Sequence, residues 1–446
     1  MDCLITVWDD IMNIKKQNLA GWGNYPTIVS SVYRPESLEQ LQKIVRHADI
    51  ILPFGNHRSY GDSALATIAL DVKKLDNVLS FDKEKGILKA EAGLLVSDLL
   101  DIIVPYGWFI SVTPGTKFVT LGGCVGANVH GKNHHKDGSF IKSTMSLEIV
   151  TADGKLVQCS PKKNKDLYQA TFGGMGLTGV VYSIEIKLTK ISSSLIEVEN
   201  IKCKNLDELF EALEDSDDTY QYTVAWIDSF AQGDSLGRGV LIAGNHSTHG
   251  SLTKAPKQKY QVPITMPTFL LNRLTLRLFN TLYYALNKTS KKLVHFNEFF
   301  YPLDAIHKWN RIYGSRGFTQ YQFVLPLNQS REGVREIMEK IAASRTGSFL
   351  SVLKRFGKEN NYISFPMEGY TLAMDFPMSK ETVRLLQELD LIVKKRKGRI
   401  YLAKDALMTE QLFKDTYPQA RTWIAIKKKY DPKNKFTSMQ AKRVGL

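Results

Sequence analysis

The amino-acid sequence predicts an α+β protein built from two domains. The chain has 446 residues, whereas a single domain usually contains roughly 100 to 200. Hydrophobic residues make up 43% of the chain and aromatic residues 10%, which excludes a disordered or fibrous protein. After residue 194, strand patterns mix with helix patterns without a strict strand–helix–strand rhythm, which favours an α+β domain over a doubly wound one. The strand patterns cover 220–227, 321–325 and 370–376, and the helix patterns cover 206–213, 331–343 and 380–395.

The first hundred residues contain helix-start signals and a loop bounded by glycines. Ser37 and Gln40 form a capping-box pattern at the start of an expected helix. Ser97 is expected to cap the helix that begins directly after it. A short buried strand at 50–54 runs into the loop 55–62. The small residues at the ends of this loop suit backbone amides that face a phosphate.

Three turn-forming segments follow. The segment 115–131 is dominated by small residues until a polar cluster appears at its end. Asp153 and Gly154 separate two short strand patterns and predict a hairpin. Residues 174–179 fit the dinucleotide motif G-x-G-x-x-G, but that motif requires a helix after it, and 180–188 alternates like a strand. We therefore interpret these glycines as a tight turn, which leaves open that they line a cofactor.

The chain is basic, and much of its excess charge lies in one internal segment. Lysine and arginine outnumber aspartate and glutamate by 59 to 45, which gives a net charge of +14 and suggests phosphate, polyanion or membrane partners. No acidic residue occurs from Ser235 to Asn297. A helix pattern there has an apolar stripe formed by Leu271, Leu274, Leu278, Leu282 and Ala285. Arg273, Arg277 and Asn280 lie on the opposite face. Residues 252–295 are expected to form a basic amphipathic lid or a membrane-contact segment. The alternative is a helix whose leucines pack on the core.

The cysteines and the N-terminus bear on cellular location. Asp2, Asp9 and Asp10 stand where a leader peptide would have a basic start, and no run approaches the roughly 18 apolar residues that cross a bilayer. We expect a cytoplasmic protein that can lie peripherally on the inner face of a membrane. Four cysteines without metal-type spacing are expected to be free thiols in a reducing compartment: Cys3, Cys124, Cys159 and Cys203.

Six motifs, spread over nearly the whole chain, are long or polar enough to indicate a family. They are Gly21-Trp22-Gly23, Arg58-Ser59-Tyr60-Gly61-Asp62, His130-Gly131-Lys132-Asn133-His134-His135, Gly176-Leu177-Thr178-Gly179, Phe318-Thr319-Gln320-Tyr321-Gln322-Phe323 and Ala403-Lys404-Asp405. The sequence resembles the vanillyl-alcohol-oxidase superfamily, which has the PCMH-type FAD fold, and within it the decaprenylphosphoryl-β-D-ribose 2′-oxidase family. The resemblance implies a PCMH-type FAD-binding domain at 1–194, completed by the C-terminal segment 405–446. An α+β substrate domain at 195–404 would be inserted between them.

The resemblance also implies a noncovalent FAD. Its pyrophosphate is expected against the loop from Pro53 to Ser63 and the turn from Gly122 to Gly126, with the flavin ring at the domain interface. Related oxidases attach FAD through a histidine in this loop. The matching position here is Arg58, with His57 beside it, so covalent attachment through His57 is the alternative. The expected FAD contacts are Pro53, Phe54, Gly55, Asn56, His57, Arg58, Ser59, Tyr60, Gly61, Asp62, Ser63, Gly115, Thr120, Gly122, Gly123, Ala127, Asn128, His130, Gly131, Gly179, Val181 and Tyr401.

Oxidation of an alcohol requires a group that takes the hydroxyl proton or stabilises the alkoxide. The resemblance places Lys404 in the active site, and His130 can act as a base or a hydrogen-bond donor because imidazole titrates near neutral pH. We expect His130 and Lys404 to be catalytic, with Tyr60 contacting flavin or substrate. A metal site at His130, His134 and His135 is not expected, because no carboxylate or thiolate partner accompanies them. Substrate contacts are expected from Lys132, Gln320, Gln322, Lys354 and Lys404.

The predicted activity is FAD-dependent oxidation of a sugar hydroxyl to a ketone. The expected substrate is a polyprenyl-phosphate pentose or a related glycan intermediate of the cell envelope, and the reaction would be the oxidative half of an epimerisation. A short-chain NAD(P)H-dependent reductase is the implied partner. Ala373, Thr371 and Phe300 depart from the residues of the family's mycobacterial member, so substrate detail stays open. The alternatives are an aldonolactone or sugar-alcohol oxidase with a soluble substrate, and a non-enzymatic membrane- or nucleic-acid-binding protein. No nucleic-acid-binding module supports a nucleic-acid partner.

Overall fold

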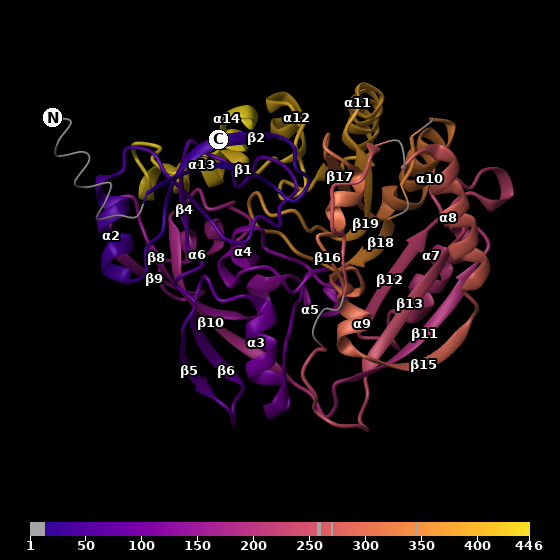
Figure 1. Ribbon diagram of the computed structural model, residues 1–446, viewed down its shortest axis with the longest axis horizontal. Coiled ribbons are helices and arrows are strands. Elements are labelled where there is room, and N and C mark those ends of the chain that lie inside the picture. Colours follow the sequence, from indigo (N-terminus) through magenta and orange to yellow (C-terminus); the bar gives the residue numbers. More distant parts are fainter. Residues whose placement is uncertain (1–13, 257–259, 269–270, 345, 349) are drawn as a thin grey trace.

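The computed structural model describes residues 14–256, 260–268, 271–344, 346–348 and 350–446. Figure 1 shows two neighbouring lobes, one formed by the N-terminal part of the chain and one by its middle part. The C-terminal helices return to the first lobe. We call residues 14–190 with 405–446 the N-terminal lobe and residues 195–400 the central lobe. Helices and sheets occur in both lobes, so the predicted α+β class is confirmed.

The N-terminal lobe contains two sheets. The first has the strand order β1-β2-β4-β3, and β2, β4 and β3 run parallel. Its strands are β1 (Lys15–Ala20), β2 (Thr27–Tyr33), β3 (Leu52–Phe54) and β4 (Ile68–Asp71). The second has the order β5-β6-β10-β8-β9, and β7 also pairs with β10. Its strands are β5 (Val78–Asp82), β6 (Ile87–Glu91), β7 (Trp108–Ile110), β8 (Thr144–Val150), β9 (Leu156–Cys159) and β10 (Val180–Lys190). The predicted hairpin joins β8 to β9, and a strand follows the Gly174–Gly179 turn as expected.

The helices of the N-terminal lobe confirm one predicted cap and correct another. The Ser37 side chain accepts from the N–H of Gln40 at the start of the first helix, as predicted (3.2 Å). Ser97 is not a cap, because its helix begins one residue earlier and the N–H groups of Val96 and Ser97 donate to the backbone of the 117–119 loop. The helices are α2 (Leu38–His47), α3 (Val96–Ile103), α4 (Leu121–Gly126), α5 (His134–Asp137) and α6 (Lys165–Thr171).

One antiparallel sheet of eight strands forms the central lobe, in the order β15-β11-β13-β12-β18-β19-β17-β20. Its strands are β11 (Leu195–Cys203), β12 (Tyr222–Ile227), β13 (Gly239–His246), β15 (Ser290–His295), β17 (Phe318–Pro326), β18 (Ser351–Phe356), β19 (Gly369–Pro377) and β20 (Arg399–Ile400). A two-stranded pair, β14 (Tyr260–Gln261) with β16 (Ile306–His307), lies apart from it. The helices are α7 (Leu206–Ser216), α8 (Arg273–Leu286), α9 (Phe296–Phe300), α10 (Leu327–Ala343) and α11 (Lys380–Lys395).

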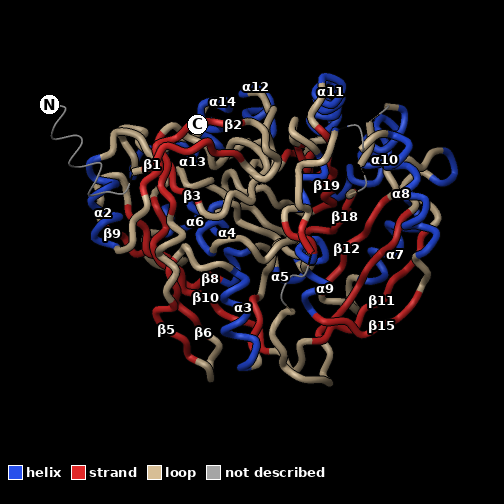
Figure 2. Tube along the Cα trace, viewed as in Figure 1, coloured by secondary structure: helices blue, strands red, loops and turns tan. Residues whose placement is uncertain are grey.

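The two faces of the large sheet differ. Helices α7, α10 and α11 pack against one face, where residues such as Phe323 and Leu372 are fully buried (Figure 2). Gln320 and Gln322 alternate with these residues along β17 and lie on the opposite face, as their spacing predicts. That second face carries the polar side chains described below.

Helix α8 shows a different arrangement from the one expected of a core-packed amphipathic helix. Asn280, which the sequence pattern groups with the cations, is fully buried and donates to Asp228 (3.0 Å) and to the carbonyl of Ser348 (3.1 Å). The alternative in which the leucine stripe packs on the core is wrong, because Leu276 and Asn280 face the interior and the leucines of the stripe within α8 face outward. Those exposed leucines are Leu274, Leu278, Leu282 and Leu286.

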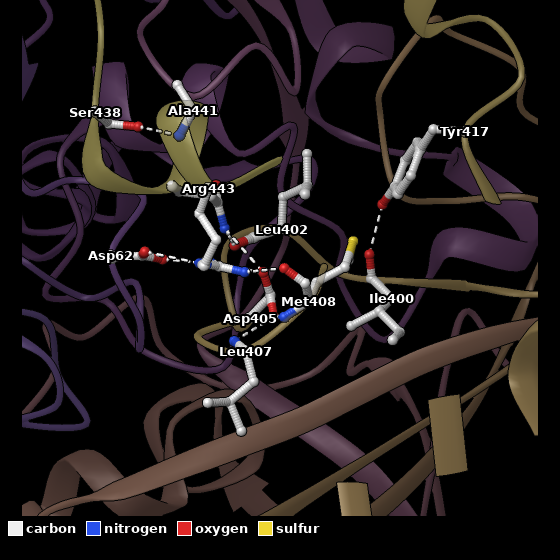
Figure 3. Close-up of polar contacts among 11 residues, drawn as sticks. Asp62, Ile400, Leu402, Asp405, Leu407, Met408, Tyr417, Ser438, Ala441 and Arg443 are labelled. Carbon is white, nitrogen blue, oxygen red and sulfur yellow. Dashed lines mark hydrogen bonds and ion pairs between the residues drawn. The ribbon is translucent and has the colours of Figure 1, made fainter. Parts of the chain in front are cut away.

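The chain ends on the N-terminal lobe, through α12 (Glu410–Thr416), α13 (Ala420–Tyr430) and α14 (Met439–Val444). Ile51 forms a parallel bridge with Phe436, and the N–H of Ile51 donates to the carbonyl of Lys435 (2.9 Å). Figure 3 shows Arg443 of α14 between the carboxylates of Asp62 and Asp405. The C-terminal segment thus completes the N-terminal lobe.

Two further expectations concern cysteines and membranes. Cys124, Cys159 and Cys203 are buried free thiols, as predicted, and Cys3 lies outside the described residues. Over the described part of the chain, no helix combines the length and the apolar character needed to span a bilayer.

Candidate active site

Three predicted cofactor segments meet in the N-terminal lobe. The loop after β3 lies directly against the start of α4, where a Cβ atom on Gly55 would come within 2.1 Å of Oγ1 of Thr120. Only glycine allows this approach. The turn before β10 joins them, because the N–H of Met175 donates to the carbonyl of Gly126 (2.9 Å). Residues far apart in the sequence therefore form one continuous surface.

This surface fits the FAD that the sequence predicts. Among the described residues, both ring nitrogens of His57, Nε of Arg58 and Nδ1 of His130 are buried without a hydrogen-bond partner. An unsatisfied buried polar atom costs about 1 to 3 kcal/mol, so a ligand with many acceptor oxygens would stabilise this region. Gly115 borders open space, since nothing lies within 4 Å of a Cβ built on it. When bound, FAD supplies the acceptor for a hydrogen and its electron pair.

Some of the predicted FAD contacts have side chains that are engaged within the protein. Asn128 donates to Glu359 (2.9 Å), and Asp62 accepts from Arg443 (2.6 Å). Val181 packs in the core of the N-terminal lobe. The side chains of Asn128 and Asp62 therefore have partners within the protein.

His130 lies at the end of the glycine-rich segment, between an aromatic ring and a glutamine. Its ring centre is 4.7 Å from that of Phe356, and its Nε2 is 3.0 Å from Nε2 of Gln322. Burial, followed by the positive charges of nearby basic groups with Lys354 the strongest, holds the pKa of His130 well below its ordinary value. The imidazole is therefore neutral at pH 7.

The three predicted substrate lysines are half-buried, and two of them, Lys354 and Lys404, act on the charge of this histidine. Burial lowers the pKa of Lys354 to about 8, and burial together with the charge of Lys354 lowers the pKa of Lys132 to about 7. Lys132 also donates to the carbonyl of Phe299. The Nζ atom of Lys404 lies 3.9 Å from the centre of the Tyr60 ring. Three half-buried lysines in one site favour an anion there.

A hydrogen-bonded network joins Tyr60 to the large sheet. Gln320 donates through Nε2 to Oδ1 of Asp375 (2.6 Å) and to the hydroxyl of Tyr60 (3.4 Å). Tyr313 donates to Oδ2 of the same carboxylate (3.4 Å). Burial raises the pKa of Asp375, against the hydrogen bond from Gln320 and the charge of Lys404. Asp375 is 1% exposed, so it is a buried carboxylate beside a lysine.

The sequence patterns did not point to Asp375, Tyr313 or Glu359. Asp375 follows Ala373 by two residues on β19, so the period of a strand was an available signal that both share a face. Glu359 had no such signal, because its partners lie more than 200 residues away in the chain. The described residues contain no group of three histidine, cysteine or acidic side chains that could hold a metal ion.

Fold and site together define a flavin-dependent oxidoreductase with a PCMH-type FAD domain, completed by the C-terminal segment, and an inserted α+β substrate domain. Residues 29–160 match the family model of the FAD binding domain, and residues 195–444 match that of D-arabinono-1,4-lactone oxidase. The chain is 33% identical to decaprenylphosphoryl-beta-D-ribose oxidase of Mycolicibacterium smegmatis, over 96% of this chain and 98% of that protein. It is 23% identical to L-gulonolactone oxidase of Mus musculus, over 92% of this chain and 94% of that protein. The chain belongs to this family of FAD-dependent sugar oxidases.

We predict that acid denaturation releases the FAD into solution. At the position where the resemblance expects the histidine of covalent relatives, Arg58 places its guanidinium 3.9 Å from the ring centre of Trp22. The ring of His57 instead packs on Phe54, with centres 4.2 Å apart. Precipitation with acid followed by absorbance of the supernatant measures the released flavin. A yellow pellet would mean covalent attachment through His57.

Proposed function

We propose that this enzyme oxidises a sugar hydroxyl to a ketone on a polyprenyl-phosphate pentose or a related glycan intermediate. The observation that carries the proposal is the excess of half-buried lysines over carboxylates in the site of His130. The charge of Lys354 lowers the pKa of His130, of Lys132 and of Lys404. Lys404 also acts on His130, and Asp375 is the carboxylate that acts on Lys404. A phosphate on the substrate would compensate this charge.

The large sheet connects the site to α8, which supports a substrate with a lipid tail. Trp226, Val352, Ala373 and Gln322 lie directly opposite one another on four adjacent strands and therefore share a face. Neighbouring strands are about 4.8 Å apart, so this row spans about 14 Å. At its far end the ring of Trp226 packs on Tyr283 of α8 (4.5 Å). The inner face of α8 thus borders the sheet face that reaches His130.

The outer face of α8 supports contact with a membrane. Its leucines range from 50% exposed at Leu282 to 78% at Leu286, and Arg273 and Arg277 beside them are also exposed. An exposed apolar stripe flanked by cations is typical of helices that lie in a membrane interface. On this proposal, α8 would meet the membrane that holds the lipid tail. The enzyme would then work at the inner face of that membrane.

A keto sugar implies a second enzyme. Oxidation at one carbon removes its configuration, and reduction from the other face restores a hydroxyl with the opposite configuration. We therefore propose a short-chain NAD(P)H-dependent reductase as the partner in an epimerisation. A reductase of this class transfers hydride from NAD(P)H, and reduction by hydride is the reaction that would consume the ketone.

Single-turnover bleaching of the flavin tests the substrate. Anaerobic enzyme is mixed with a polyprenyl-phosphate pentose, with the same sugar lacking the phosphate, and with an aldonolactone. We expect bleaching with the lipid-linked phosphate, at least a hundredfold faster than with the other two. Equal or faster bleaching by the aldonolactone would favour the second candidate, a soluble-substrate oxidase, which the match to the D-arabinono-1,4-lactone oxidase model supports.

Vesicle binding tests the membrane contact. Replacing Leu274, Leu278 and Leu282 with serine is expected to lower binding to anionic vesicles at least tenfold, because about 25 cal/mol are lost per Å² of apolar surface that would be buried. The matched control replaces Leu391 with serine, since it is a comparably exposed leucine on α11 (67%). Co-sedimentation with vesicles that contain anionic lipid measures both. Unchanged binding of the α8 variant would reject the membrane role.

A further inference from the structure

Thr371 fixes the orientation of the Gln322 amide. The hydroxyl of Thr371 donates its single hydrogen to the carbonyl of Phe323 (2.8 Å), because a carbonyl can only accept. The Thr371 oxygen can therefore only accept at its contact with Gln322 (3.2 Å). The Gln322 atom at this contact must be the amide nitrogen.

The oriented amide in turn fixes the tautomer of His130. The same amide nitrogen lies 3.0 Å from Nε2 of His130. Since an amide N–H only donates, Nε2 accepts, and the proton of the neutral imidazole lies on Nδ1. Nδ1 is buried and has no partner among the described residues. His130 therefore offers a donor to a ligand, while its basic nitrogen is already occupied.

Of the two residues that the sequence predicts to be catalytic, His130 and Lys404, the lysine is then the one left to accept the proton. Its ammonium group lies on the ring of Tyr60, and the charged groups that act on it are Asp375 from β19 and Lys354 from β18. Burial and Lys354 favour the neutral amine, whereas Asp375 favours the ammonium form. A group under such opposed influences can change its charge during turnover. The hydrogen bonds from Gln320 (2.6 Å) and Tyr313 (3.4 Å), with the charge of Lys404, favour the carboxylate form of Asp375, whereas burial raises its pKa.

We propose that Lys404 takes the substrate's hydroxyl proton, that Asp375 positions Lys404 and sets its charge, and that His130 is a hydrogen-bond donor through Nδ1. Oxidation of a CH–OH group to a ketone breaks one C–H and one O–H bond. Bound FAD would supply the acceptor for the hydrogen on carbon and its electron pair, and the hydroxyl proton would move to the neutral amine of Lys404, which would become ammonium. The inference depends on oxidation of a CH–OH group and not on which sugar carries it.

The pH dependence of flavin reduction tests the roles of Lys404 and Asp375. The rate should rise with pH as Lys404 loses its proton. Lys404→Arg should lose at least about a hundredfold in rate, because arginine stays protonated. Asp375→Asn should move the rising limb to lower pH by roughly one to three units, since removal of the negative charge favours the neutral amine. If Asp375 had only a structural role, its replacement would change the rate without shifting the rising limb of the pH profile.

Tyr313→Phe gives a second test should Asp375→Asn lose its flavin. Without the Tyr313 hydroxyl, the carboxylate of Asp375 loses a hydrogen-bond donor and binds a proton more readily. The rising limb of the pH profile should therefore again move to lower pH, but less far than in Asp375→Asn. The FAD absorbance of every variant shows whether it is folded and loaded. A Lys404→Arg enzyme within tenfold of wild type, or a limb that stays in place in both the Asp375 and Tyr313 variants, would overturn the assignment.

Two substitutions and one spectrum test His130. Asparagine carries its amide nitrogen near the place of Nδ1, so His130→Asn should keep the rate within tenfold. Glutamine reaches the place of Nε2 instead, so His130→Gln should lose about a hundredfold. In ¹⁵N-histidine-labelled enzyme without substrate, the signal missing from His130→Asn should report the neutral Nδ1–H tautomer. An Nε2–H tautomer, or equal losses in both variants, would overturn the donor role whether or not the proposed substrate is correct.

Discussion

Replacing Arg443 with methionine is expected to lower the free energy of unfolding by about 3 to 5 kcal/mol and to release FAD. The guanidinium donates to Asp62 (2.6 and 3.0 Å), to Asp405 (2.9 Å) and to the carbonyl of Met408 (2.5 Å) (Figure 3). Both carboxylates are 5% exposed, so the variant would leave two buried charges without a cation. Because Asp62 ends the predicted FAD loop, loosening it should free the cofactor. Denaturant titration followed by protein and flavin fluorescence measures both effects.

The loss should shrink as the pH falls. Without Arg443, the two buried carboxylates would bind protons more readily in the folded chain than in the unfolded one. The folded state of the variant therefore gains stability as the pH falls toward 5. Lys442→Met is the matched control, because this neighbour is exposed, and its effect should stay within about 0.5 kcal/mol. If the Arg443 variant is as stable as the control at pH 8, the ion pair does not hold the C-terminal segment.

Elements whose signals are local could be predicted from the sequence. The Ser37 cap and the hairpin at Asp153 depend on residues a few positions apart, and both are confirmed. Ser97 and the faces of α8 could not be predicted, since each depends on a distant segment. The 117–119 loop binds the first amides of α3, and Asp228 draws Asn280 into the interior.

In the site, too, features with local sequence signals could be predicted, and features that depend on distant segments could not. The resemblance to a family pointed to His130 and Lys404, and the period of a strand placed Gln320 and Gln322 on one face. The partner of Gln320 could not be found in this way, because the register between β17 and β19 decides that Asp375 lies opposite it. Pairing of strands that lie 55 residues apart is set by packing, and the sequence of either strand alone does not encode it.

Glu359 of the central lobe holds the segment that carries His130. One carboxylate oxygen accepts from Asn128 (2.9 Å) and from the hydroxyl of Ser139, and the other accepts from the N–H of Ser139 (3.0 Å) and lies 3.4 Å from Nε2 of His134. Ser139 is the bridge partner of His130. Ser139 donates to Glu359 through both its backbone N–H and its hydroxyl. The carboxylate therefore holds the backbone segment that pairs with His130.

Glu359→Gln is therefore expected to slow flavin reduction by about ten- to a hundredfold and to lower the free energy of unfolding by about 1.5 to 3 kcal/mol. Glutamine has the same shape, but donors face both oxygens of Glu359, so its amide N–H groups would meet other donors whichever way it turns. Stopped-flow reduction and denaturant titration measure the two effects. Lys358→Gln is the control, because this exposed neighbour should leave both unchanged. A Glu359→Gln enzyme that reduces its flavin at the control's rate would show that His130 keeps its position without the contact between the lobes.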